Sequence, residues 1–186
     1  MKNYKKNLEL LTKNHVYSKE MEHDACGVGL IASTEGKKSR AIVEYGIEAL
    51  KAVWHRGAVD ADGKSGDGAG IHIEIPKDFF IEKIEVTGHD YDKSEICVGM
   101  IFLPRNDYTA QENCKTIVES ELTKNNFSIY GWRQVPVNPK VLGEKALQTM
   151  PEIIQVLFKS NDSNLVDKNL ERKIYETRKK IENKAF

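Results

Sequence analysis

The residue of this chain best placed to do chemistry is Cys26, which opens the apolar run CGVGLIAS. Gly27 and Gly29 leave little side-chain bulk beside the thiol and permit unusual backbone dihedrals around it. If the peptide bond before Cys26 were cut, the new α-amino group, with a pKa of roughly 7.7–8, could act as general base for its own thiol. The alternative is that Cys26 is buried as a small hydrophobic core residue.

The second stretch that could carry chemistry is HRGAVDADGKSGDGAG, residues 55–70, whose glycines and aspartates are typical of a loop. The guanidinium of Arg56 suits a carboxylate or a developing oxyanion, and the GDGAG glycines suit a tight turn. The alternative is a surface turn with a solvated arginine. The stretch matches neither of the common glycine-rich phosphate-binding patterns.

Other kinds of site find little support. The three cysteines form no C-x-x-C pair, which argues against disulfides and structural zinc, and we expect Cys97 and Cys114 to be packing residues. The histidines are scattered, so we predict no metal site. The 28 basic and 28 acidic side chains cancel, which favours neither nucleic acid nor a membrane surface as partner. No signal peptide or membrane-spanning run is present, so we predict a cytoplasmic protein.

The elements that must position these residues alternate irregularly between strands and helices, which favours the α+β class. Residues 1–25 are polar and aperiodic, and we interpret them as a leader or extended arm. The patterns predict strands at 26–33, 70–75, 95–103, 127–137 and 151–158, and helices at 39–54, 107–124, around 143–148 and from about 164 onward. In the first of these helices Val43, Ile47, Leu50 and Trp54 predict a broad buried face.

Several motifs, in this order and spacing, resemble a known family. They are DACGVGLIA, AVWHRGAVDADGKSGDGAGIHIEIP, VGMIFLP, GWRQVPV and LERKIYETRKKIE. Together they are similar to the amino-terminal glutaminase domain of glutamate synthase large subunits, a class II glutamine amidotransferase among the N-terminal nucleophile hydrolases. The resemblance runs from Cys26 to the end of the chain and implies a four-layer αββα sandwich, of which residues 26–186 would be the first part.

The resemblance also implies roles for particular residues. Residues 1–25 would be a propeptide, removed between Ala25 and Cys26, and Cys26 would attack L-glutamine. Arg56 matches the arginine of the family's HRG motif, which lines the glutamine site. The supporting loop residues would be His55, Gly57, Asp67, Gly68 and Gly70.

In complete enzymes of this kind the ammonia passes to 2-oxoglutarate at a second site that uses FMN and an iron–sulfur cluster. We expect no cofactor in this segment. The implied partners are L-glutamine, the remainder of the synthase chain and a small NAD(P)H-oxidising subunit. The family's oxyanion-hole Asn-Gly pair and its substrate-gripping Arg and Asp follow the last helix in relatives. We therefore expect these 186 residues alone to have no useful glutaminase activity. The alternatives are a non-catalytic assembly module and a different class II amidotransferase.

Overall fold

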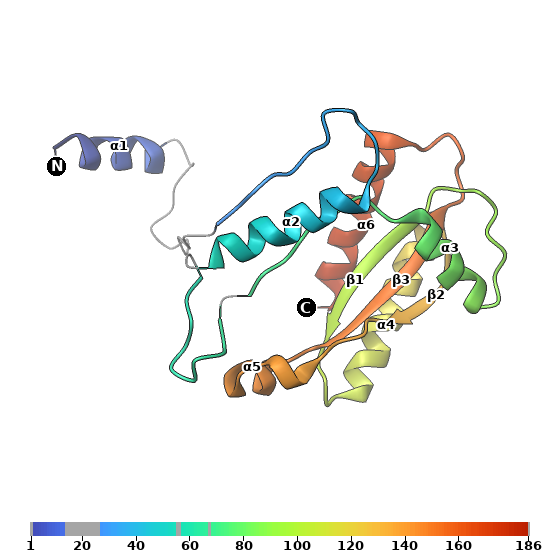
Figure 1. Ribbon diagram of the computed structural model, residues 1–186. Coiled ribbons are helices and arrows are strands. Elements are labelled where there is room, and N and C mark those ends of the chain that lie inside the picture. The colour runs from blue at the N-terminus through green and yellow to red at the C-terminus, as the bar shows by residue number, and fades with distance from the viewer. Residues whose placement is uncertain (1, 14–26, 55–56, 67, 186) are drawn as a thin grey trace. The chain divides into compact units, whose positions relative to one another are not determined.

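The computed structural model describes residues 2–13, 27–54, 57–66 and 68–185 (Figure 1). The chain divides into two compact units. The first comprises residues 1–59 and 66–71, and the second comprises residues 60–65 and 72–186. Each unit is described by itself.

The first unit contains the helices α1 (Lys2–Lys13) and α2 (Arg40–Ala52). The expectation of an aperiodic arm before Cys26 is therefore wrong for residues 2–13. The sequence of α1, KNYKKNLELLTK, is rich in lysine and leucine, which are strong helix formers. Local propensity therefore accounts for a helix that the search for an apolar period did not find.

Helix α2 confirms the predicted helix but only part of its predicted burial. Ser39 is the N-cap, and its side chain accepts a hydrogen bond of 3.2 Å from the amide of Ala41. Residues on the predicted apolar face, such as Val43 and Ile47, are half-buried rather than buried. Trp54 is 74% exposed, so the apolar face does not extend to the end of the predicted range.

The second unit is built on one antiparallel sheet with the strand order β1-β3-β2. Its strands are β1 (Cys97–Leu103), β2 (Phe127–Gln134) and β3 (Glu152–Ser160). Its helices are α3 (Lys77–Val86), α4 (Tyr108–Lys124), η2 (Pro139–Val141), α5 (Glu144–Thr149) and α6 (Asp167–Ala185). Except for α3 and η2, these elements were predicted from the sequence, and the mixture of helices with an antiparallel sheet is consistent with the α+β class.

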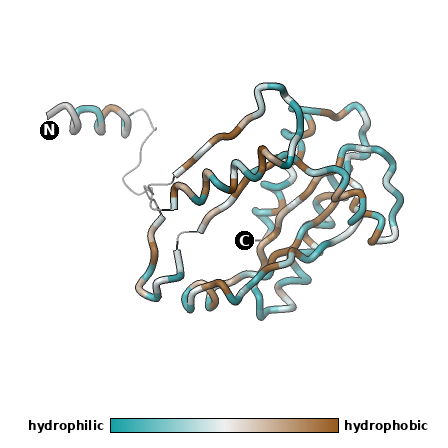
Figure 2. Tube along the Cα trace, in the orientation of Figure 1, coloured by the Kyte–Doolittle hydropathy of each residue, from teal (hydrophilic) through white to brown (hydrophobic). Residues whose placement is uncertain are grey.

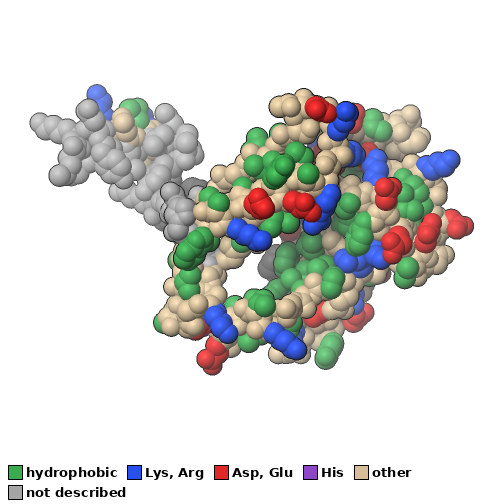
Figure 3. Space-filling model, in the orientation of Figure 1, with side chains coloured by type: hydrophobic (Ala, Val, Ile, Leu, Met, Phe, Trp, Pro, Cys, Tyr) green, Lys and Arg blue, Asp and Glu red, His purple; other side chains and the backbone are tan. Residues whose placement is uncertain are grey.

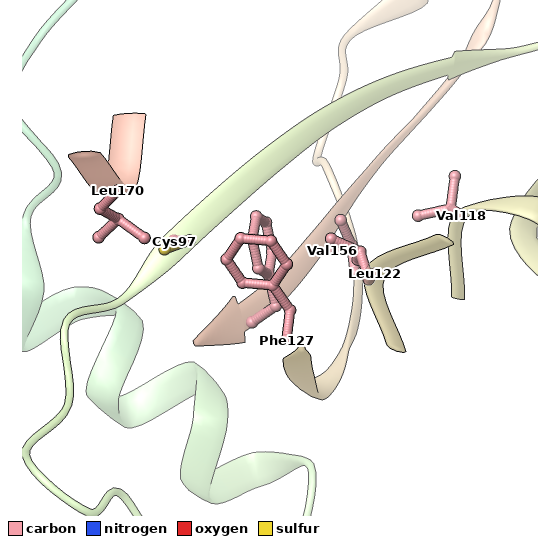
Figure 4. Packing of buried hydrophobic residues seen from close by; sticks show 7 residues of the cluster. Cys97, Val118, Leu122, Phe127, Val156 and Leu170 are labelled. Atoms are coloured by element: carbon pink, nitrogen blue, oxygen red, sulfur yellow. The ribbon is translucent and has the colours of Figure 1, made fainter. Parts of the chain in front are cut away.

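Helices α4 and α6 cover one face of this sheet, and the main hydrophobic core lies beneath them (Figures 1 and 4). Phe127 and Phe158 meet edge to face there, with ring centroids 5.3 Å apart. The buried members of this core are Cys97, Val118, Leu122, Phe127, Val156, Phe158 and Leu170. The burial of Cys97 in this core confirms its predicted packing role.

The opposite face of the sheet is covered at one end by α3, a helix that the sequence reasoning missed. Phe80 and Ile84 of α3 pack with Tyr130 and Leu157 of the sheet in a second buried cluster. Gly131 in β2 has φ +152°, and a Cβ there would lie 2.8 Å from a side-chain atom of Thr87, so only glycine fits without strain.

Two predicted strands are not formed, at 27–33 and at 70–75. Their described residues have no regular secondary structure, and Val28 and Leu30 are 93% and 89% exposed. A strand requires a hydrogen-bonded neighbour, because its backbone N–H and C=O groups are otherwise unpaired. The described residues supply no such neighbour to either segment, so the apolar pattern alone does not produce a strand.

Charge and hydropathy are distributed as in a well-solvated domain. Hydrophobic colour follows much of the strands in Figure 2, and Lys or Arg side chains alternate with Asp or Glu over the face in Figure 3.

An ion pair connects helices α4 and α6. Lys184 Nζ lies 2.5 Å from Glu121 Oε1, and this hydrogen bond holds the pKa of Glu121 below its usual range. None of the described helices is long and apolar enough to cross a membrane.

Candidate functional site

Four of the predicted site residues, Cys26, His55, Arg56 and Asp67, lie outside the described residues. Their geometry is therefore approached through the segments on either side. The structure does describe Gly57, Gly68 and Gly70, together with the hairpin between Gly57 and Asp67, which we call the 58–66 hairpin.

The segment after Cys26 is open. Residues 27–30 are exposed, and a Cβ on Gly29 would meet no atom within 4 Å. Backbone next to the cysteine is thus unhindered, as a nucleophile that must meet a substrate requires. The accessibility of the Cys26 thiol itself stays a prediction, and the expected strand is absent from residues 27–33.

The turn that leads into the 58–66 hairpin follows directly from the end of α2. The amide of Gly57 donates a 3.0 Å hydrogen bond to the carbonyl of Trp54. A Cβ on Gly57 would lie only 3.3 Å from that same carbonyl oxygen, so the turn is tight at this point. Gly68, on the far side of the hairpin, has φ +87°, which favours glycine.

The neck of the hairpin is an isolated antiparallel bridge between Val59 and Gly66. A Cβ on Gly66 would approach the carbonyl oxygen of Ala58 to 2.9 Å, closer than real side chains come. The glycines of this stretch therefore allow two backbone segments to approach closely, as the sequence predicted for a tight turn.

The tip of the hairpin is organised by the carboxylate of Asp62. It accepts hydrogen bonds from the amides of Lys64 and Ser65, at 2.9 and 2.7 Å, and from the Ser65 hydroxyl at 2.6 Å. These donors, the Ser65 hydroxyl first, hold the pKa of Asp62 well below its usual range. Gly63, between these residues, has φ +69°. The tip is thus a turn fixed by hydrogen bonds to the Asp62 carboxylate, which is ionised near neutral pH.

Sequence reasoning missed the contact between this tip and α5. Ser65 is only 7% exposed, and its Oγ accepts a hydrogen bond of 3.3 Å from the amide of Ala146 in the first turn of α5. Lys145 Nζ reaches Asp60 Oδ2 at 2.7 Å. The spacing Asp62-x-x-Ser65 signals a side-chain-stabilised turn, but nothing local in the sequence indicates a partner 81 residues away.

The second unit holds further features of chemical interest. A pocket of about 380 Å³ lies between residues 102–106 and 148–151. Burial raises the pKa of the Cys97 thiol to about 12, with Glu95 adding to the effect. Among the described residues, no group of three or more His, Cys, Asp or Glu side chains is arranged to hold a metal ion.

Comparison with known proteins gives this arrangement a context. A family model described as class II glutamine amidotransferases matches residues 26–186. The chain is 51% identical over 179 residues to the NADPH glutamate synthase large chain of Azospirillum brasilense. The aligned region covers 96% of this chain and 12% of that protein. It is 41% identical over 162 residues to ferredoxin-dependent glutamate synthase 1 of Arabidopsis thaliana, covering 87% of this chain and 10% of that one.

A third relative is the ferredoxin-dependent glutamate synthase of Pyropia yezoensis, 40% identical over 174 residues, or 93% of this chain and 11% of the relative. The chain thus spans about a tenth of the length of these relatives. The matched region of the family model begins at Cys26 and contains the whole 55–70 stretch.

Proposed function

Because the chain belongs to the class II glutamine amidotransferases, in the branch found in glutamate synthases, we propose that it is the glutaminase part of such an enzyme. In the complete enzyme this part hydrolyses L-glutamine to glutamate and ammonia, with Cys26 as the nucleophile. The observation that carries this proposal is the coincidence of the start of the family match with Cys26, the residue whose flanking glycines already marked it as accessible.

The proposed reaction is acyl transfer through a thioester. The Cys26 thiol gives its proton to its own α-amino group, and the sulfur attacks the side-chain amide carbon of glutamine. The carbon–nitrogen bond breaks, and the ammonium form of the amine supplies the proton with which ammonia leaves. Water then attacks the thioester, releases glutamate and restores the thiol.

The described cysteines support Cys26 as the nucleophile by contrast. Cys97 is buried in the main core, and a thiol with a pKa of about 12 holds almost no thiolate near neutral pH. Cys114 is half-buried within α4, an element that packs the sheet. Neither has the glycine-flanked, open surroundings of the segment after Cys26.

Arg56 has the chemistry to bind the substrate. We propose that its guanidinium contributes to the glutamine site, where a planar fork of donors suits a carboxylate. His55, Gly57, Asp67, Gly68 and Gly70 shape the loop on which Arg56 lies. The tight turn at Gly57 and the positive φ of Gly68 support this shaping role.

We also propose that residues 1–25 are a propeptide whose removal exposes the amine of Cys26, and that the domain is part of a four-layer αββα sandwich. The sheet covered by α4 and α6 supplies one helical layer and one sheet of that arrangement. The apolar run 27–33 and the alternating segment 70–75 are largely exposed, as strands without a partner would be.

For the whole protein we propose that ammonia passes to 2-oxoglutarate at a separate site. FMN and an iron–sulfur cluster would supply the redox chemistry there, and a small NAD(P)H-oxidising subunit is a further proposed partner. Iron–sulfur clusters are held by sets of cysteine thiolates. The two cysteines among the described residues, one of them buried, do not form such a set. Other parts of the protein would therefore hold these groups.

The test combines mass and activity on the protein at its native length. Intact mass should give a chain that starts at Cys26, and the protein should release glutamate from glutamine. Cys26→Ala should abolish this release, while Cys97→Ala should retain it in whatever fraction remains folded. If the Cys26→Ala variant hydrolyses glutamine as fast as the unmodified protein that starts at its native residue, the proposal is wrong.

A second candidate function is that of an assembly module without catalysis. The exposure of Val28 and Leu30 favours it, because large apolar side chains in an extended segment suit pairing with another polypeptide. Co-purification of a second polypeptide with a protein that does not hydrolyse glutamine would support this candidate over the first.

A further inference from the structure

We propose that the pocket between residues 102–106 and 148–151, which we call the Arg105 pocket, binds a small carboxylate. The ligand would have an apolar or aromatic body and no positive charge. The volume of about 380 Å³ lies within the roughly 300–1,000 Å³ typical of small-molecule sites. All lining residues belong to the second unit and are described. The proposal concerns binding alone, so it does not rest on the proposed function.

The Arg105 pocket forms where two segments of the chain leave the same end of the sheet. Strand β1 ends at Leu103, which pairs with Glu152 at the start of β3. The segment after β1 leads into α4, and the segment before β3 comes from α5 (Figure 1). Leu103 is 3% exposed and Phe102 is 64% exposed. The end of the sheet therefore contributes one buried and one open apolar side chain to the lining.

Hydrogen bonds fix the backbone of the wall that carries Arg105. Gln111 of α4 is 8% exposed, and its Nε2 donates to the carbonyls of Pro104 and Arg105 at 2.8 and 3.2 Å. The carboxylate of Asp107 caps α4 by accepting from the amide of Ala110 at 2.9 Å. This wall is therefore ordered before a ligand binds, which lowers the entropic cost of binding.

The guanidinium of Arg105 is the ionisable group in the lining, and it has no carboxylate partner among the described residues. The ion pairs of that part of the chain do not include it. Its Nη1 makes only a long contact of 3.8 Å with Met150 Sδ on the other wall. An arginine stays charged throughout the physiological pH range and presents five donors in one plane. These donors are therefore available to a carboxylate.

The carboxylates next to the pocket in the sequence are already engaged. Asp107 caps α4, and Glu152 accepts a hydrogen bond from Gln134 of β2. Neither of them lines the pocket. An ammonium group on the ligand would therefore find no opposite charge there, and a desolvated charge without a partner is costly. The lining thus favours acids without an amine over free amino acids.

The rest of the lining suits an apolar or aromatic body. Phe102 and Met150 supply a ring and a thioether, and two prolines add rigid apolar surface. The side-chain amides of Asn106 and Gln148 can donate to the oxygens of a carboxylate. Hydrocinnamate, a phenyl ring joined to one carboxylate by two methylene groups, has this combination of features.

The test compares three compounds that share the phenylpropyl skeleton. Hydrocinnamate carries the carboxylate alone, L-phenylalanine adds an ammonium group, and hydrocinnamyl alcohol carries no charge. Their binding to the native-length protein is measured by titration with saturation-transfer NMR. We expect hydrocinnamate to bind with a Kd in the millimolar range. The other two should bind at least about tenfold more weakly, the factor typical of one charge-assisted hydrogen bond.

Two variants assign the binding to this pocket. Arg105→Gln removes the charge and should weaken hydrocinnamate at least about tenfold. Gln148→Glu adds a negative charge to the other wall and should also weaken it, and this variant decides alone if Arg105→Gln does not fold. Arg172→Gln is the matched control and should bind like the parent, because Arg172 is an exposed arginine of α6 outside the lining.

Selective binding of hydrocinnamate that is lost in Arg105→Gln and kept in Arg172→Gln supports the proposal. Absence of saturable binding, or equal affinity for L-phenylalanine, would overturn it. An affinity for hydrocinnamate that is unchanged in Arg105→Gln would overturn it as well, as would displacement of hydrocinnamate by excess L-glutamine, because the compound would then occupy another site.

Discussion

Substitution of Leu157 by alanine tests the core on which the second unit depends. Leu157 is completely buried in the central strand β3, where it pairs with Val98 on one side and Gly131 on the other. The change deletes three carbons, worth about 2.4 kcal/mol at about 0.8 kcal/mol per methylene. The cavity left behind raises the expected loss to about 3–4 kcal/mol. For a chain of this length the melting temperature should fall by roughly 6–16 °C.

Urea unfolding followed by tryptophan fluorescence measures this loss. Trp132 lies in β2, and its indole N–H donates to Glu119 at 2.7 Å, so its emission reports on the second unit. The solvent-exposed Trp54 is replaced by phenylalanine in every sample. Leu147→Ala is the control, because Leu147 is 40% exposed and should lose less than about 1 kcal/mol. A loss below about 1 kcal/mol for Leu157→Ala, with an unchanged m-value, would refute the proposed packing of the second cluster.

Three further predictions follow from other contacts. Because the pKa of Cys97 is raised to about 12, iodoacetamide at pH 8 should label Cys114 in the native protein and Cys97 only after unfolding, as peptide mass spectrometry will show. Lys184 lowers the pKa of Glu121, so its stabilisation is complete above the ordinary carboxylate range and is lost as pH falls through the lowered pKa. Urea titrations of Glu121→Gln should therefore differ from the parent near pH 7 and converge with it in strong acid. Gly131→Ala should cost about 1–3 kcal/mol in the same titration, because it combines a positive φ with a close contact; a loss no greater than that of Leu147→Ala would contradict this reasoning.

Apart from α2, the elements that sequence patterns predicted correctly lie in the second unit. Strands β1 and β3 appear as continuous apolar runs, and Asp107 is the N-cap of α4 at the predicted boundary. The segments 27–33 and 70–75 have equally good patterns but no strand, because pairing depends on residues far away in the chain. Helix α3 was missed since its KDFFIEKIEV run follows Pro76 directly and its apolar residues show only a weak helical period.

The candidate site was likewise predictable from the sequence only in part. The accessible backbone after Cys26 and the glycine-dependent turns of residues 57–70 were predictable, because glycine acts through local sterics. The contact of Ser65 with Ala146 was not, because an uncapped helix beginning at a glycine gives no sign of where its cap comes from. The roles of Cys26 and Arg56 stay predictions that the mass and activity measurements test.

The strand order β1-β3-β2 also governs the order of events during synthesis. β3 is the last strand to be made, yet both other strands pair only with it. β1 ends at residue 103 and β3 begins at residue 152, which leaves roughly 50 residues of translation in between, or roughly 2–10 s at typical rates. During that interval β1, joined by β2 once residue 134 has been made, has no partner strand in this sheet, so the sheet can close only after β3 has been synthesised.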